Sequence, residues 1–294
     1  MTGAILETSP GLKQSKAQTR RVRPVVRIRP SAGWRALDFG ELWQYRDLMY
    51  FLAWRDVKVR YKQTALGVAW AILQPLAAMV VFTVFLGALV HVPSDGLPYA
   101  LFAYVGLLPW TFFANAAAGA SSSLVANTNL VAKVYFPRLA IPIAAVLAGL
   151  VDLGIGLVLL IGLLLFFGVS PGAGLLLLPV FVGLTVLTAL AVGIWLSALD
   201  VQYRDVRYAI PFLIQVWLFA TPVVYPASVV PEQYRPLYGL NPMAGVVEAF
   251  RWALLGRNDF PGPILAVSTL VLAVVLVTGL FYFRRMERSF ADVI

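Results

Sequence analysis

The chain has 294 residues, of which 60% are hydrophobic and 13% charged, and its formal net charge is +9. Soluble domains average roughly 45–50% apolar and about 25% charged residues, so this composition excludes a water-soluble globule and indicates an integral membrane protein. The absence of cysteine excludes disulfides and thiolate metal sites, and the single histidine, His91, gives no basis for a histidine metal centre, so we expect no metal site.

Basic residues are concentrated near the start of the chain. Of the 23 Lys and Arg residues, 13 lie in residues 1–62, a distribution that orients a membrane protein and does not indicate nucleic-acid binding. Residues 1–40 combine eight of them with Pro, Ser, Gln and Thr. This segment predicts a disordered basic tail on the cytoplasmic side, close to anionic membrane lipids.

Residues 41–63 predict an amphipathic interfacial helix. At 100° per residue, one face collects the residues Leu42, Tyr45, Met49, Leu52 and Ala53. The opposite face collects Gln44, Asp47, Arg55, Lys58 and Lys62. The segment is too charged to span a bilayer, so we expect it to lie in the membrane plane.

The rest of the chain predicts an all-α integral membrane domain over residues 64–288, followed by a short cytoplasmic end at residues 289–294. Its unbroken apolar runs are far longer than the ~10 residues of a transmembrane β-strand. We expect six transmembrane helices, at about residues 65–90, 99–125, 139–168, 175–199, from near 210 onward, and 264–283.

Counting basic residues tests this topology. With both termini cytoplasmic, 20 Lys and Arg residues fall on the inside and only Arg235, Arg251 and Arg257 fall outside. Positively charged loops are retained on the cytoplasmic side, so the count predicts an even number of spans with both ends inside. Between the fifth and sixth spans, residues 222–261 are rich in proline and have apolar pieces too short to cross, which predicts re-entrant or short helices on the outer side.

Asp152 is an acid deep within an apolar span. It lies roughly 20 Å along the helix from Leu139, near the middle of a ~30 Å hydrocarbon core. Such a group needs a partner and faces the bundle interior or an aqueous path. Because Gly149, Gly154 and Gly156 flank it, close helix packing with an internal hydrogen bond is the structural alternative to a role in transport.

Several separated motifs together resemble a known family. They are WRDVKVRYKQTALGVAW at 54–70 with Gln74-Pro75, KVYFPR at 133–138, YRDV at 203–206, TPVVYP at 221–226, and NPM at 241–243 followed by Arg251. In this order they resemble the permease subunits of ABC-2 type exporters, within the branch that exports lipid-linked polysaccharides such as O-antigen, capsule and teichoic acid. The resemblance covers about residues 41–290 and does not extend to the tail at 1–40.

The resemblance implies a transport subunit in a bacterial inner (plasma) membrane, not an enzyme. It implies a homodimer that works with two copies of a nucleotide-binding ATPase and translocates an undecaprenyl-pyrophosphate-linked glycan. The chain has no Gly-x-x-x-x-Gly-Lys-Ser/Thr phosphate loop. We therefore expect no cofactor on this chain and ATP and Mg²⁺ on the partner.

Candidate site residues follow from the same motifs. Coupling to the ATPase is expected at a first loop, with Lys133, Tyr135, Phe136, Pro137 and Arg138, and at a second loop, with Arg204 and Asp205. Contact with the lipid pyrophosphate is expected at Arg55, Lys58, Arg60 and Lys62, since cations match phosphate. An outer gate is expected at Pro222, Tyr225, Pro226, Asn241, Pro242 and Arg251.

Each expectation has an alternative. The two loops can be plain cytoplasmic loops, whose cations set topology in the first and pair internally in the second, and the cluster from Arg55 to Lys62 can be a topology anchor. The function can also be export of a small molecule or drug by the same family. A membrane glycosyltransferase or acyltransferase belongs to another class, and the dispersed acids and lone His91 argue against it.

Overall fold

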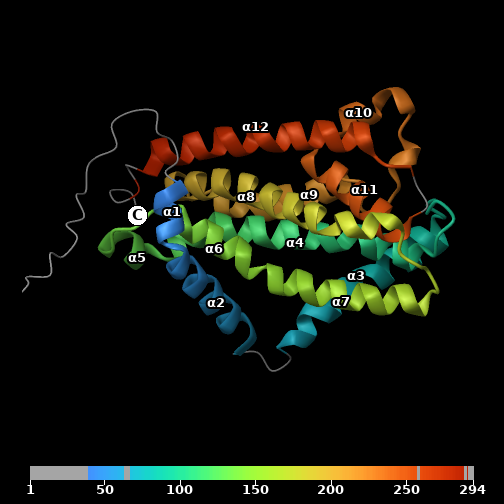
Figure 1. Ribbon diagram of the computed structural model, residues 1–294, viewed down its shortest axis with the longest axis horizontal. Coiled ribbons are helices and arrows are strands. Elements are labelled where there is room, and N and C mark those ends of the chain that lie inside the picture. Colours follow the sequence, from blue (N-terminus) through green and yellow to red (C-terminus); the bar gives the residue numbers. More distant parts are fainter. Residues whose placement is uncertain (1–38, 63–66, 257–258, 288–289, 291–294) are drawn as a thin grey trace, which may run out of the picture. The chain divides into compact units, whose positions relative to one another are not determined.

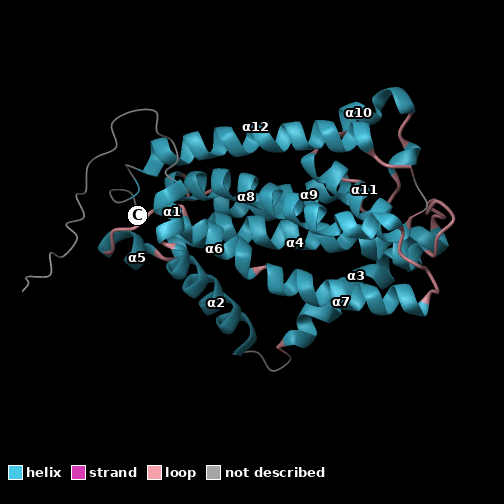
Figure 2. Cartoon of the chain, viewed as in Figure 1, coloured by secondary structure: helices cyan, strands magenta, loops and turns pink. Residues whose placement is uncertain are grey.

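The computed structural model describes residues 39–62, 67–256, 259–287 and 290 (Figure 1). The predicted tail at 1–40 lies outside these residues except at its last two positions, and so does the short end at 289–294 except Phe290. The described residues form helices joined by loops and turns, with no strand among them (Figure 2). The all-α prediction is therefore confirmed for the described part of the chain.

The helices follow the apolar runs. In chain order they are α1 (Phe39–Gln44), α2 (Arg46–Lys62), α3 (Val68–Phe82), α4 (Tyr99–Ala126), α5 (Thr128–Lys133), α6 (Ala140–Ala148), α7 (Leu150–Phe166), α8 (Leu178–Gln202), α9 (Val206–Phe219), α10 (Arg235–Tyr238), α11 (Pro242–Leu255) and α12 (Gly262–Glu287). A π-helical segment, Thr83–Leu89, continues α3, and 3₁₀ turns occupy Ala173–Leu177, Ala227–Val229 and Glu232–Tyr234.

Five helical segments are long and apolar enough to cross a membrane: Ala69–Leu89, Tyr99–Ala126, Ala140–Phe166, Gly174–Gln202 and Gly262–Glu287. The sixth expected span, near residue 210, is the apolar helix α9, which has 14 residues. At 1.5 Å per residue α9 rises about 21 Å, which is shorter than a ~30 Å hydrocarbon core. The structure thus supports five to six spans.

Helix α4 is the centre of the fold. It packs against α3, α6, α7, α8, α9 and α11, and 78% of its most apolar window is buried, compared with 6% for the segment that begins at Ala69. Its buried aromatic side chains pack on one another and on α9: Phe113 meets Trp217 edge to face, with ring centroids 5.1 Å apart. Helix α4 is therefore a buried central helix, and a helix of this kind is mostly apolar on every face. Helix α3 lies at the periphery.

The expected apolar face of the interfacial segment packs on the protein itself. Leu52 is 3% exposed, and Leu42, Tyr45, Met49 and Ala53 pack against the same cluster of side chains, because α2 lies on α6. The exposed side of α1 and α2 has aromatic residues instead: Trp43, Tyr50, Phe51 and Trp54. The structure divides the predicted single helix into α1 and α2 at Tyr45, and the stripe expected to face the membrane contacts protein instead.

The short helices predicted between the last two spans are present. Helix α11 has 14 residues and is almost entirely buried, and α10 has four residues. Gly245 of α11 lies against Ser268 of α12, whose hydroxyl accepts a hydrogen bond from the Gly245 amide at 3.1 Å. A side chain at position 245 would collide with Ser268, so glycine permits this close approach.

Candidate functional site

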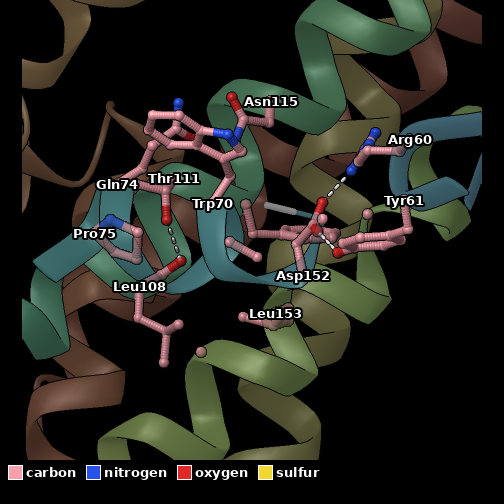
Figure 3. A pocket seen from close by; sticks show the side chains of 15 residues that line it. Arg60, Tyr61, Trp70, Gln74, Pro75, Leu108, Thr111, Asn115, Asp152 and Leu153 are labelled. Atoms are coloured by element: carbon pink, nitrogen blue, oxygen red, sulfur yellow. Dashed lines mark hydrogen bonds and ion pairs between the residues drawn. The ribbon is translucent and has the colours of Figure 1, made fainter. Parts of the chain in front are cut away.

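A pocket of about 480 Å³ lies between the end of α2, the start of α3, and the helices α4 and α7. Figure 3 shows its polar side chains in two groups, with Arg60, Tyr61 and Asp152 at one side and Trp70, Gln74 and Asn115 at the other. The remaining lining residues are Gly67, Ala71, Pro75, Leu108, Thr111, Phe112, Gly149, Leu153 and Gly156. Seven of the 15 lining residues come from the end of α2 and the first span, four come from α4, and four come from residues 149–156.

Asp152 has partners that are more than 90 positions away in sequence. The Arg60 guanidinium forms an ion pair with one carboxylate oxygen, and the Tyr61 hydroxyl donates a hydrogen bond to the other (Figure 3). The Asp152 side chain is 25% exposed and the Arg60 side chain 45% exposed. A charge within a spanning helix is stabilised by such pairing, so Asp152 has the partner that its depth requires.

Two glycines near Asp152 approach α4 closely: Gly156 in α7, and Gly149, which directly precedes α7. A Cβ atom at Gly156 would approach Leu108 Cδ1 to 2.4 Å, and one at Gly149 would approach the Phe112 ring to 3.2 Å. Close backbone approach of this kind is the usual role of small residues at membrane helix interfaces. The packing alternative considered for Asp152 therefore describes Gly149 and Gly156 but not Gly154, which has open space beside it, while Asp152 itself binds Arg60 and Tyr61.

The Tyr61 hydroxyl is a donor in this site. Burial, followed by the hydrogen bond to Asp152 and the charge of that carboxylate, raises the pKa of Tyr61 above its usual value. The phenol therefore keeps its proton at neutral pH. Tyr61 and Arg60 together occupy both oxygens of the carboxylate.

The other basic residues expected to contact pyrophosphate have separate environments. Arg55 pairs with its neighbour Asp56 at 2.8 Å, and Lys58 Nζ lies 5.6 Å from the centre of the Trp54 ring. Lys62 is exposed at the end of α2. The structure therefore does not gather the four expected pyrophosphate ligands into one cluster.

The first predicted coupling loop presents one aromatic residue outward and buries the next. Tyr135 is 65% exposed, whereas Phe136 is 5% exposed and packs in the cluster that contains Leu52. Lys133 ends α5 and is exposed, and Pro137 follows in the turn. Arg138 donates a hydrogen bond to the carbonyl of Glu287 at the end of α12, so it ties this loop to the last helix.

The second predicted coupling loop lies between α8 and α9. Arg204 and Asp205 are both exposed there, next to the exposed ring of Tyr203. The buried carboxylate of Asp200 accepts a hydrogen bond from Arg207 at 3.4 Å. The pairing alternative considered for this loop thus applies to Asp200 and Arg207 and leaves Arg204 and Asp205 on the surface.

Asn241 joins the elements of the expected outer gate. Its side-chain oxygen accepts from the Met243 amide and from Trp217 Nε1, both at 3.0 Å, and so caps α11 and ties it to α9. Its amide donates to the Thr221 hydroxyl at 2.8 Å. Pro242 is the first residue of α11, where proline is favoured.

Arg251 is buried where this region meets α4. Its side chain is 1% exposed and pairs with Glu248 at 2.8 Å. It donates to the carbonyls of Val223 at 2.6 Å and Tyr225 at 3.3 Å, and its guanidinium lies 3.8 Å from the Phe102 ring centre. Arg251 therefore fixes the segment around Pro222 and Pro226 onto α4.

Tyr225 also forms bonds to neighbouring elements. The Tyr225 hydroxyl donates to the Phe219 carbonyl at 3.0 Å and contacts the Tyr238 hydroxyl. Pro222 is buried and precedes the carbonyls that Arg251 binds. Of the six predicted gate residues, Tyr225, Asn241 and Arg251 thus form the bonds between these elements, and Pro222, Pro226 and Pro242 are next to them in sequence.

Sequence reasoning missed the second group of pocket residues, Trp70, Gln74 and Asn115. A signal was available, because Trp70 and Gln74 are four positions apart and so share a face of the first span. Asn115 is a lone amide within an otherwise apolar run. Sequence reasoning also missed Glu248, which is three positions before Arg251 on the same helix.

Comparisons with known proteins match this architecture to a transporter family. A family model described as ABC-2 type transporter matches residues 47–255. The chain is 30% identical over 256 residues to the O-antigen export system permease protein RfbA of Myxococcus xanthus, covering 86% of this chain and 97% of that protein. It is 28% identical over 253 residues to the RfbA protein of Klebsiella pneumoniae, covering 84% and 95%.

A further relative is the polysialic acid transport protein KpsM of Escherichia coli. It is 23% identical over 236 residues, which cover 80% of this chain and 92% of that protein. The matched segments of these relatives span nearly their whole length, so the similarity concerns the complete helical domain and not a single motif.

Proposed function

Because this chain belongs to the ABC-2 type transporter family, we propose that it is the permease subunit of an ATP-driven exporter for a polysaccharide linked to undecaprenyl pyrophosphate. ABC-2 permeases are multi-pass membrane proteins and transport components that function with ATPase subunits. The observation that supports the proposal most is the 30% identity to an O-antigen export permease over 97% of that relative's length. The proposed location is the bacterial inner membrane.

The proposed assembly is a homodimer with two ATPase subunits. In this assembly ATP and Mg²⁺ bind the ATPase, and the permease provides the path for the glycan. The proposed topology has both termini cytoplasmic, and the 20 to 3 distribution of basic residues supports it. With this topology the loops at 127–138 and 203–206 face the cytoplasm and the unit around Arg251 lies at the outer side.

We assign coupling to the exposed parts of the two cytoplasmic loops. The exposed residues available to a partner are Lys133 and Tyr135 in the first loop and Arg204 and Asp205 in the second. The buried Phe136 packs the first loop against the rest of the protein. A loop held between two helices transmits rigid-body motion to both of them. Among the basic residues of α2, Lys58 and Lys62 have no carboxylate partner within the described residues, so we assign lipid pyrophosphate contact to these two.

Deletion of the gene in its host tests the proposed function. We expect loss of the surface polysaccharide and accumulation of the lipid-linked glycan on the inner leaflet, with both defects repaired by a plasmid copy. Purified without its partner, the permease is expected to show no ATP hydrolysis. Unchanged surface polysaccharide after deletion would refute the proposal, as would ATP turnover by the permease alone.

Export of a small molecule is the alternative within the family. The two functions differ in what accumulates after deletion: the polysaccharide exporter leaves lipid-linked glycan inside, whereas a small-molecule exporter leaves surface glycan intact and changes drug sensitivity. A strain that loses drug resistance and keeps its surface glycan would favour the alternative.

A further inference from the structure

We infer that the pocket between α3, α4 and α7 is a contact site for uncharged sugar residues, formed by the Trp70 ring and the amides of Gln74 and Asn115. This inference rests on the proposed function and specifies which part of the lipid-linked glycan the pocket recognises. It assigns to these three residues the recognition of sugar, and not of the pyrophosphate or the lipid.

The amides of Gln74 and Asn115 form no hydrogen bond with the part of the chain that the structure describes. Gln74 and Asn115 are exposed on helices that are long enough to span the membrane. An amide that faces hydrocarbon without a hydrogen bond is strongly unfavourable. This face of α3 and α4 therefore needs water or a polar ligand against it.

Side chains of these types match a sugar ring. An amide offers a donor and an acceptor side by side, which suits two neighbouring hydroxyl groups. The Trp70 ring, 51% exposed, offers a flat apolar surface for the C–H face of a pyranose. Figure 3 shows Trp70, Gln74 and Asn115 at the same side of the pocket, and all three line it.

The charge of the pocket argues against pyrophosphate. Its charged lining residues are Arg60 and Asp152, which pair with each other and cancel. A pyrophosphate would have to take Arg60 from Asp152 and leave that carboxylate unpaired near the middle of a span, which is unfavourable. An uncharged sugar makes no such demand. The volume of about 480 Å³ lies within the roughly 300–1,000 Å³ of ligand pockets.

Binding of carrier-free polysaccharide tests the inference. The permease with its ATPase partner is placed in nanodiscs, and the probe is the host's own surface polysaccharide, released by mild acid and labelled at its end. We expect the double substitution Gln74→Leu with Asn115→Leu to weaken binding about tenfold, since two hydrogen-bonding groups are lost. Trp70→Leu is expected to weaken binding similarly, and Trp70→Phe to retain most of it.

Matched controls distinguish sugar recognition from other effects. Gln215→Leu removes an exposed glutamine from the apolar helix α9, outside the pocket, and is expected to bind like the unmodified protein. Inorganic pyrophosphate is expected not to compete, and added salt is expected to change the affinity little, because the contacts are uncharged.

Three results would overturn the inference: no binding of the probe to the unmodified protein, equal binding by the double variant, or displacement of the probe by inorganic pyrophosphate. Failure of the proposed function would give a different pattern of results. If the probe binds as expected but deletion of the gene leaves the surface polysaccharide unchanged, the sugar site stands and the export function fails.

Discussion

Removing the buried Arg251 is expected to destabilise the protein severely. Its side chain is 1% exposed and binds Glu248 together with the carbonyls of Val223 and Tyr225, against the Phe102 ring. Substitution Arg251→Met keeps much of the apolar volume but leaves the Glu248 carboxylate, 10% exposed, without its cation. Breaking a buried pair in this way costs about 3–5 kcal/mol.

A second substitution tests this reasoning. In the double variant Arg251→Met with Glu248→Leu both charges are gone, so only the two carbonyls lose their donor. Arg251→Met alone has the same loss and an unpaired buried carboxylate in addition. The double variant is therefore expected to be more stable than Arg251→Met alone. The matched control is Arg235→Met, because Arg235 also pairs with an acid three positions before it and donates to two backbone carbonyls, those of Val230 and Ser228. Its pair with Glu232, 3.5 Å apart, is exposed at Glu232, and such a pair contributes ~1 kcal/mol or less.

Thermal unfolding of the purified protein in detergent measures these effects. At about 2 °C per kcal/mol for a large domain, Arg251→Met is expected to lower the melting temperature by on the order of 6–10 °C. Arg235→Met is expected to lower it by no more than about 2 °C. A melting temperature for Arg251→Met equal to that of the control, or a double variant no more stable than Arg251→Met, would refute the assignment of Arg251 as the buried anchor.

Three further predictions concern the Arg60–Asp152 pair, the loop at 133–138 and Lys62. A double-mutant cycle with Arg60→Gln and Asp152→Asn is expected to give a coupling energy of about 1–2 kcal/mol, which is less than for a fully buried pair because both groups are partly exposed. Additive effects of the two substitutions on thermal unfolding would contradict the pairing. Tyr135→Ala is expected to leave stability unchanged and to reduce export and the ATP hydrolysis coupled to it, and normal export would leave that loop without a coupling role. Phe136→Ala is expected to cost about 3–5 kcal/mol of stability. Lys62→Gln is expected to weaken binding of undecaprenyl pyrophosphate in nanodiscs, and unchanged binding would assign Lys62 to topology alone.

The spans were predictable because crossing a bilayer constrains the sequence locally. Hydrophobic length alone placed five of the helices within a few residues, as at Tyr99–Ala126. The region near residue 210 was less well predicted, because α9 ends at Phe219 and the chain then turns. What holds that turn is a set of bonds to Arg251 and Asn241, which come later in the chain.

The sequence also predicted the apolar stripe within residues 41–63, but it did not predict which surface this stripe contacts. A helical wheel identifies a stripe such as Leu42, Met49 and Leu52 without indicating whether lipid or protein covers it. The structure places this stripe on α6 and leaves Trp43 and Trp54 exposed. The same limit applies to Tyr135 and Phe136, where neighbouring aromatic residues have opposite exposure.

By itself, the sequence determined the membrane class, the helical spans and the need of Asp152 for a partner, because bilayer insertion depends on local hydrophobicity and charge. Only the tertiary structure identified that partner as Arg60, which the sequence had assigned to pyrophosphate. The two residues are 92 positions apart, and no local pattern specifies which distant helix faces a given side chain. The packing of α2, α3, α4 and α7 brings Arg60 to Asp152 and forms the pocket.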